Sequence, residues 1–408
     1  MNLAKSKLSI NAWKINRPFL ILSLGRLISQ FGDKLYLLAL PWLVLELTHS
    51  ALYSSITFAL ETIPAVLLAP FIGVYVDRKT RKGVMIGADF IRGLVIGAIT
   101  LLSFTGKIEM VYIYIGAFLL SALTLLFDSA SEGYLPKIVA KEKLVEANAN
   151  LTFINTLMRL VGPPVAGISI AMIGADGTIG INAVSFFLSG IILIFLPQDT
   201  MAVEIGKKVK TIIKDIKEGF SYLFNHQTLF PIAVFSTFMN IGIFMVTTLI
   251  IFESKETLGY GPKETSLIFW ISGFFATITT LLIKPLKKIM DKGQMIRYGS
   301  IGVLIAILIL VFDQSLITIT ASYSLILMVG IIVNVNMMAY RQEIIPNHLF
   351  GRVMTSSRVL VNAFAPLAMV LAGWLANKYN AVIVFELASV IVFFNVLYAW
   401  FSKLKYIK

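Results

Sequence analysis

Long apolar stretches alternate with short polar segments along the whole chain. A helix needs roughly 20 apolar residues to cross about 30 Å of hydrocarbon, and the apolar stretches reach that length. The chain lacks the strict polar and apolar alternation of membrane β-strands, and only helices or closed barrels satisfy their backbone hydrogen bonds in lipid. The pattern therefore predicts an all-α membrane protein.

The apolar stretches predict twelve transmembrane helices in two sets of six. The first set covers residues 18–47, 51–76, 83–105, 109–130, 146–173 and 177–197, and the second covers 228–253, 264–284, 294–312, 315–340, 354–376 and 380–402. Residues 198–227 between them are lysine-rich with apolar residues at helical spacing, which is typical of an amphipathic helix on a membrane surface. We expect an N-terminal six-helix bundle (1–197), a cytoplasmic linker with this amphipathic helix (198–227) and a C-terminal six-helix bundle (228–408).

An internal repeat relates the two sets. Segments 134–167 and 343–373 each contain a short basic loop with a proline, followed by a helix with Pro and Gly near its middle. Parallel half-repeats with a cavity between them near the bilayer midplane are the architecture of many transporters. The two bundles are therefore expected to be pseudo-symmetric.

Charge sets the expected orientation. The net charge of +13 does not predict a nucleic-acid partner, because the basic residues cluster in short segments between apolar runs. Most of them fall on one side of the predicted membrane, and cytoplasmic loops are enriched in Lys and Arg. We expect a bacterial cell membrane protein with both termini in the cytoplasm and an uncleaved first helix, since its apolar run is too long for a signal peptide.

Composition narrows the function classes. A content of 57% hydrophobic and 14% charged residues excludes an ordinary soluble domain. The chain has no cysteine, its three histidines are scattered, and it has no nucleotide-binding G-x-x-x-x-G-K-[ST] loop. These absences predict no metal site, no cofactor, no enzymatic activity and an ion gradient as the energy source.

The segment GVYVDRKTRK, residues 73–82, resembles the G-x-x-x-D-R-x-x-R-[RK] signature of the major facilitator superfamily. The resemblance implies the major facilitator fold and a cytoplasmic gate motif formed by Gly73, Asp77, Arg78, Arg81 and Lys82. Gly73 would allow close helix approach, and the acid would lie near a helix N-terminus of the other half, here that of 354–376. The alternative, a simple cytoplasmic charge cluster, accounts for the basic residues but not for the acid and the glycine.

The segment LMRLVGPPVAG, residues 157–167, resembles the antiporter motif G-x-x-x-G-P-x-x-G-G of the same superfamily through Gly162, Pro163 and Gly167. Met158 and Ala166 depart from that pattern. The resemblance implies antiport. The alternative is a Pro-kinked helix with small residues for packing.

Segments 25–52 and 136–149 resemble the drug:proton antiporter branch that includes macrolide efflux proteins of Gram-positive bacteria. The resemblance implies secondary active export of amphipathic drugs, macrolide-like or cationic, by proton antiport and alternating access. The expected partners are a small amphipathic substrate, protons and the lipid bilayer, and the expected state is a monomer. The alternatives are a lysophospholipid or siderophore translocator of the same superfamily and, outside transport, a membrane sensor or receptor.

Ionisable residues inside predicted helices are candidates for the transport machinery, because a charge in a membrane is costly. Arg26, Gln30 and Asp33 are spaced to form one polar stripe that should face the central cavity. Asp33 lies near mid-depth, which suits proton coupling, and the alternative is a structural ion pair with Arg26 or Lys34.

Other polar residues extend the expected cavity. Glu61, midway along its predicted helix, is the second candidate for proton coupling, with packing through a hydrogen bond as its alternative. The remaining expected cavity residues are Asn155, Arg159, Arg358 and Asn362.

Overall fold

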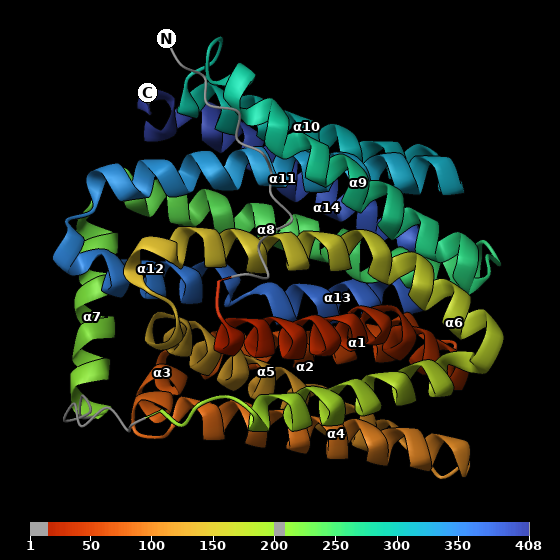
Figure 1. The fold of residues 1–408 in the computed structure, drawn as a ribbon. Helices are drawn as coiled ribbons and strands as arrows, with labels where there is room; N and C mark the ends of the chain where they lie inside the picture. The colour runs from red at the N-terminus through yellow and green to blue at the C-terminus, as the bar shows by residue number, and fades with distance from the viewer. Residues whose placement is uncertain (1–14, 200–208, 408) are drawn as a thin grey trace.

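The computed structural model describes residues 15–199 and 209–407, so the basic N-terminal segment 1–14 and residues 200–208 of the predicted linker lie outside it. Every regular element in the described ranges is helical, which confirms the all-α prediction. Figure 1 shows most helices running side by side along one direction, with α7 (Val209–Asn225) lying across them at one end.

Within the described residues, six α-helices precede α7. They are α1 (Arg17–Thr48), α2 (Ala51–Leu67), α3 (Ala69–Asp77), α4 (Arg81–Phe104), α5 (Met110–Ile138) and α6 (Leu144–Ile194). The predicted helices 146–173 and 177–197 form the single element α6, which reverses direction in Figure 1. The turn is at Gly174, whose φ of 74° lies in the left-handed region that glycine adopts without steric cost.

The second half follows α7. Its main helices are α8 (Leu229–Phe252), α9 (Pro262–Leu286), α10 (Lys292–Phe312), α11 (Leu316–Ile344), α12 (Asn347–Asn362), α13 (Ala365–Lys378) and α14 (Ala381–Phe401). A π-helical segment η3 (Glu253–Thr257) extends α8, and short 3-10 segments η2 (Lys141–Lys143) and η4 (Lys403–Tyr406) precede α6 and follow α14.

Two predicted helices are interrupted. The predicted helix 51–76 is divided into α2 and α3, and the predicted helix 354–376 is divided into α12 and α13. A proline, Pro70 or Pro366, stands at the start of the second piece in each case. Because proline lacks an N–H and clashes with the preceding turn, a helix tends to break there. These interruptions were not predicted, although residues 347–378 together still form one apolar stretch long enough to cross a membrane.

Within the described ranges, nine helices are long and apolar enough to cross a membrane, or ten if α2 and α3 count together. α6 enters this count once although it turns at Gly174. α1 does not enter it, because Arg26, Asp33 and Lys34 make its middle polar. The number of twelve spans therefore stays a prediction.

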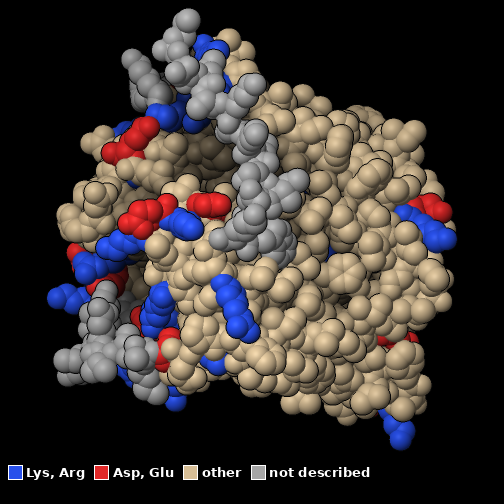
Figure 2. Space-filling model, in the orientation of Figure 1, with Lys and Arg blue, Asp and Glu red and all other residues tan. Residues whose placement is uncertain are grey.

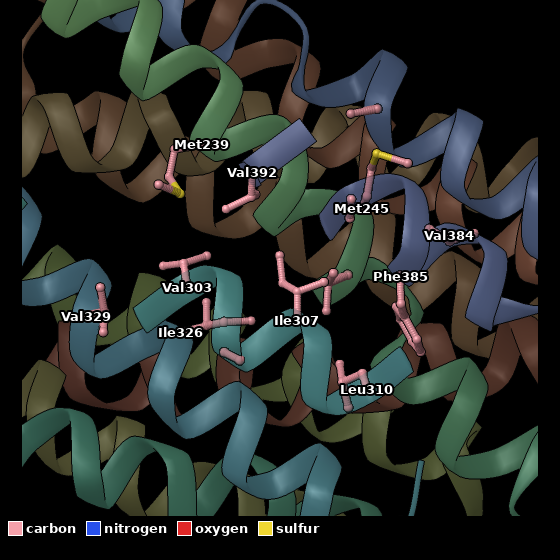
Figure 3. Packing of buried hydrophobic residues seen from close by; sticks show 14 of the residues in the cluster. Met239, Met245, Val303, Ile307, Leu310, Ile326, Val329, Val384, Phe385 and Val392 are labelled. Atoms are coloured by element: carbon pink, nitrogen blue, oxygen red, sulfur yellow. The ribbon is translucent and has the colours of Figure 1, made fainter. Parts of the chain in front are cut away.

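Each half has its own buried apolar clusters. In the second half, side chains from α8, α10, α11 and α14 interlock, as Figure 3 shows for Met245, Val303, Ile307, Ile326 and Phe385. In the first half, residues of α1, α4, α5 and α6 form a comparable cluster. Between membrane helices such packing is stabilised by van der Waals contact more than by exclusion of water.

The outer surface is apolar. Large side chains such as Leu94, Leu101, Met172 and Phe394 are more than half exposed. Figure 2 shows one face of the molecule that is almost free of charged residues over most of its length. Exposure on this scale is costly in water but suits contact with lipid.

Candidate functional site

The two ends of the molecule differ in charge. We call the end that carries α7 the linker end and the other the opposite end. On the face shown in Figure 2, Lys, Arg, Asp and Glu side chains gather at the linker end, where the surface is hollowed, and few occur at the opposite end. The linker end is therefore the end expected to meet the cytoplasm.

At the opposite end the two halves of the chain are joined by polar contacts. The Ser50 hydroxyl donates a hydrogen bond to Asn377 Oδ1 at 2.9 Å, and Nδ1 of His49 lies 2.9 Å from Glu256 Oε2. Lys255 Nζ, next to Glu256, lies 5.5 Å from the ring centroid of Trp42. The turn between α1 and α2 is thus fixed to η3 and α13.

Two glycines allow the backbones to approach at the same end. A Cβ atom on Gly167 would lie 2.6 Å from the carbonyl oxygen of Pro262, and one on Gly373 would lie 2.7 Å from that of Ala51. A backbone atom cannot rotate away, so any side chain at these positions would push the helices apart. α6 therefore packs closely on α9, and α13 on α2.

Toward the linker end the halves separate around cavities. A cavity of about 650 Å³, the gate cavity, lies between the first-half residues Gly73 and Asp77 and the α12 residues His348 and Arg352. A first-half cavity of about 400 Å³ and a second-half cavity of about 810 Å³ lie on the two sides of the interface. The structure is closed at the opposite end and open at the linker end.

The first-half cavity brings together polar residues from several helices. Gln30 and Asp33 of α1, Glu61 of α2 and Asn155 of α6 line it, as the sequence predicts for a shared cavity. Asp33 and Glu61 are both half-buried, and the Tyr36 hydroxyl lies beside the Glu61 carboxylate. Two carboxylates near mid-depth thus share one polar space that water can enter.

Arg26 is held by α5. Its guanidinium donates hydrogen bonds to the Ser131 hydroxyl at 2.9 Å and to the Asp128 carboxylate at 3.3 Å. Asp33 forms an ion pair with neither Arg26 nor Lys34 in the part of the chain that the structure describes. The structural ion pair considered as an alternative for Asp33 is absent from this conformation of the described residues.

Asp128 is a cavity residue that the sequence analysis missed. It lines the first-half cavity as an acid inside the long apolar run of α5. Asp33 and Glu61 were selected because each is a charged residue inside a predicted span. The same criterion would also have selected Asp128.

The second-half cavity holds two residues that were expected in one cavity together with the first-half residues. Arg358 and Asn362 of α12 line it, together with Arg341 of α11 and Met239 of α8. Asn240 donates a side-chain hydrogen bond to Asn362 Oδ1 at 3.3 Å. The lining is mainly apolar with several polar groups, which suits an amphipathic ligand.

The gate motif is not closed on the other half in this conformation. The Asp77 carboxylate accepts a hydrogen bond from Arg81 at 3.3 Å, and no described residue of α12 donates one to it. A Cβ on Gly73 would meet no described atom within 4 Å, because Gly73 faces the gate cavity, and Arg78 is exposed. The expected close approach at Gly73 is therefore absent here.

The basic residues of the gate motif tie two helix ends together within the first half. The backbone N–H groups of Arg81 and Lys82, at the start of α4, donate to the Asp199 carboxylate at 2.9 and 3.2 Å. Lys82 Nζ donates to the carbonyl oxygens of Ile194 at 2.7 Å and Leu196 at 2.6 Å, at the end of α6. Both contacts satisfy groups that helix ends leave unpaired, with charges of the sign that the helix dipoles favour.

Burial by itself would raise the pKa of Asp199, but the hydrogen bonds from Arg81, Lys82 and Lys137 outweigh it and hold the pKa below 3.8. Asp199→Ala should therefore destabilise the protein by about 1–3 kcal/mol. Because the folded-state pKa is lowered, the stabilisation is full at neutral pH and is lost as the pH falls below the unfolded value. Thermal unfolding of purified protein at a series of pH values checks this.

Asp199→Asn is the matched control, because it keeps an acceptor for the α4 N-terminus but removes the charge. It should lose less stability than Asp199→Ala and should lose the part of the pH dependence that Asp199 contributes. Equal unfolding temperatures for the wild type and Asp199→Ala at neutral pH would contradict the prediction.

The antiporter-like motif lies at the interface between the halves. Gly162 packs directly on the Lys34 side chain, and Gly167 contacts α9 as described above. Pro163 and Arg159 line a fourth cavity, the interface cavity, of about 260 Å³. Arg159 and Asn155, both expected in the central cavity, thus line two different cavities. No cluster of His, Cys, Asp and Glu that could hold a metal occurs within residues 15–199 and 209–407.

Solved structures with the same arrangement are transporters. A bacterial homologue of the iron transporter ferroportin, in an inward-facing state, has a TM-score of 0.75 at 16% identity and covers 94% of this chain and 98% of its own. The nucleoside transporter NupG has a TM-score of 0.76 at 13% identity, with coverages of 94% and 98%. At these identities the likeness shows the fold alone.

Relatives by sequence are transport proteins of bacteria. The multidrug efflux pump Tap of Mycolicibacterium fortuitum is 25% identical over 370 residues, 88% of this chain and 89% of that protein. The macrolide efflux protein A of Streptococcus pyogenes is 24% identical over 227 residues, 56% of each, and the uncharacterized transporter YvqJ of Bacillus subtilis is 26% identical over 57% of this chain and 56% of its own. The last two matches span only about half of the relatives' length.

Residues 22–366 match the Major Facilitator Superfamily, over most of the chain. The helical fold, the closed and open ends and the transporter relatives agree with that match. The chain belongs to the major facilitator superfamily.

Proposed function

We propose that the protein is a secondary active exporter of amphipathic drugs that exchanges its substrate for protons. The observation that carries the proposal is the pair of half-buried carboxylates, Asp33 and Glu61, in one cavity near the middle of the membrane helices. A carboxylate there is costly as a lasting charge and can exchange a proton with an open cavity. The relationship to Tap over 88% of the chain supports drug efflux.

Transport requires the two halves to move against each other. We assign these moving units to residues 1–197 and 228–408, with 198–227 as the linker. The first state is the one described, open at the linker end. In the second, the contacts of Ser50, Gly167 and Gly373 at the opposite end separate, and Asp77 approaches α12 across the gate cavity.

The distribution of charge supports a bacterial cell membrane location with the linker end and both termini in the cytoplasm. Substrate would then enter from the cytoplasm or the inner leaflet and leave at the opposite end. We assign the working unit as a monomer, since each chain contains both halves of the pathway.

Inverted membrane vesicles carrying the protein test this function. With an acidic interior imposed, a panel of drugs should accumulate inside, and a proton ionophore should abolish the accumulation. Accumulation that is unaffected by the ionophore would contradict proton antiport. Accumulation of a lysophospholipid or a metal chelator, with none of any drug, would change the substrate class.

A further inference from the structure

The interface cavity lies where the two halves face each other and is separate from the three cavities described above. α1 and α6 of the first half and α9 and α11 of the second half enclose it. Arg159 is two turns before Gly167 in α6, so the cavity lies just inside the contact that closes the opposite end. A ligand there would touch both halves at once.

Two cations face this cavity. Lys34 of α1 and Arg159 of α6 line it, and both occupy the middle of long membrane helices. Neither side chain has a hydrogen bond or an ion pair to any residue in the ranges 15–199 and 209–407, and the Arg159 side chain is exposed to the cavity. An uncompensated charge at this depth is costly and by default has a functional role.

No carboxylate of the first-half cavity forms an ion pair with either cation among the residues that the structure describes. Lys34 also borders the first-half cavity, where Asp33 influences it through space, but Asp33, Glu61 and Asp128 line that cavity and not this one. Among the residues that the structure describes, no acidic one lines the interface cavity. A bound anion would therefore be the nearest counter-charge for Arg159.

A glycine lies against the stem of each cation. A Cβ on Gly162 would clash with the Lys34 side chain, and one on Gly273 would lie 3.4 Å from the Arg159 carbonyl oxygen and 3.5 Å from its Cγ. The stems of the two cations are thus packed against helix backbones from different helices. A larger residue at Gly162 would displace the Lys34 stem, whereas a Cβ at Gly273 would be in ordinary van der Waals contact with Arg159.

The rest of the cavity wall is apolar and aromatic. Phe269 and Tyr323 meet edge to face with ring centroids 5.4 Å apart, and Leu37, Leu327 and Ile331 complete the wall. Such a wall can hold a flat or branched apolar group. Tyr323 lines the same cavity as Arg159, and its hydroxyl is a hydrogen-bond donor available to a ligand.

We propose that the interface cavity is an anion-binding subsite for substrates that carry a carboxylate or a phosphate group on an apolar, aromatic body. Lys34 and Arg159 would hold the anionic group, and Phe269 and Tyr323 would hold the body. This subsite rests on the proposed transport function. It implies that the exporter prefers acidic and zwitterionic substrates to substrates that carry only a positive charge. Because Lys34 and Arg159 come from α1 and α6, and the aromatic rings come from α9 and α11, binding would also favour the conformation described here.

Equilibrium binding to purified protein in lipid nanodiscs, without a gradient, tests the subsite. The probes share one naphthalene body: 1-naphthoate, 1-naphthyl phosphate, neutral 1-naphthamide and cationic 1-naphthylmethylamine. At least one anion should bind roughly tenfold or more tightly than the amide, and the cation should bind more weakly than the amide. Comparison of the two anions identifies which anionic group the subsite takes.

Variants test whether Lys34 and Arg159 cause the preference for anions. Lys34→Gln with Arg159→Gln should bring anion binding down to the level of the amide, whereas Lys34→Arg and Arg159→Lys should retain most of the preference. Lys107→Gln, at an exposed lysine outside the cavities, is the control for net charge. Binding of the amide itself reports that each variant is folded.

Two results would overturn the subsite. One is equal binding of all four probes to the wild type, as expected if the cations are merely hydrated by cavity water. The other is an anion preference that persists in the Lys34→Gln and Arg159→Gln double variant. Drug accumulation in vesicles despite either result would leave the exporter function standing, whereas anion binding without any gradient-driven accumulation would contradict the exporter function alone.

Discussion

Replacing Asp33 with asparagine is expected to reduce proton-driven drug accumulation in inverted vesicles to the background level. The amide has the size of the acid but cannot exchange a proton, so substrate movement would no longer be coupled to proton entry. Exchange of labelled for unlabelled substrate, which needs no gradient, should continue. Uptake with an imposed proton gradient and exchange without one are the two measurements.

Two other carboxylates of the same cavity provide matched controls. Glu61→Gln tests the second candidate for coupling, and Asp128→Asn tests an acid that is already neutralised by Arg26. We expect Asp128→Asn to retain coupled uptake. If Asp33→Asn retains full gradient-driven uptake while Glu61→Gln loses it, the coupling group is Glu61, and if all three retain it the carboxylate proposal is wrong.

Replacing Gly373 with valine is expected to prevent closure of the opposite end. The new side chain would meet the Ala51 carbonyl oxygen and the Ser55 side chain, and overpacking of this kind costs about 1–3 kcal/mol. A change of about 1.4 kcal/mol alters an equilibrium constant tenfold. The population of the state closed at the opposite end should therefore fall by roughly tenfold or more. Transport should fall with it, because the cycle passes through the closed state.

Closure can be measured by crosslinking because the chain has no cysteine of its own. Ser50→Cys with Asn377→Cys places a thiol pair at the existing contact, which a short bifunctional thiol reagent should join. Gly373→Val should lower the crosslinking rate by a similar factor. Gly87→Val is the control, since a Cβ there meets no described atom within 4 Å, and an unchanged rate in Gly373→Val would contradict the role of this glycine.

The hydrophobic pattern predicted the helices well because each membrane span must be apolar over the thickness of the bilayer. All twelve predicted stretches are helical in the described residues, and the turn at Gly174 falls between two of them as expected. The breaks after α2 and α12 were missed, although Pro70 and Pro366 signal them. A proline inside an apolar run is compatible with either a kink or a break, and the neighbouring helices decide between them.

The candidate site was predictable only as a set of residues. Mid-helix polarity identified Asp33, Glu61 and Arg159, but it gave no information about which side chains meet. Arg26 pairs with Asp128, 102 residues away, and Lys34 faces Arg159 only because Gly162 brings α1 and α6 together. Such pairs depend on how each helix is rotated and which helices pack together. The spacing of polar residues along a sequence does not reveal either.

In the orientation proposed above, the single-residue turn at Gly174 has a consequence for anything that approaches the protein from outside the cell. α6 leaves and re-enters the bundle without a loop, and α1 passes to α2 through only His49 and Ser50. At these two turns, antibodies, proteases and water-soluble inhibitors would then find very little projecting chain to bind. An inhibitor should therefore have to be permeable and act from the cavity side, where Figure 2 shows the surface hollowed among charged groups.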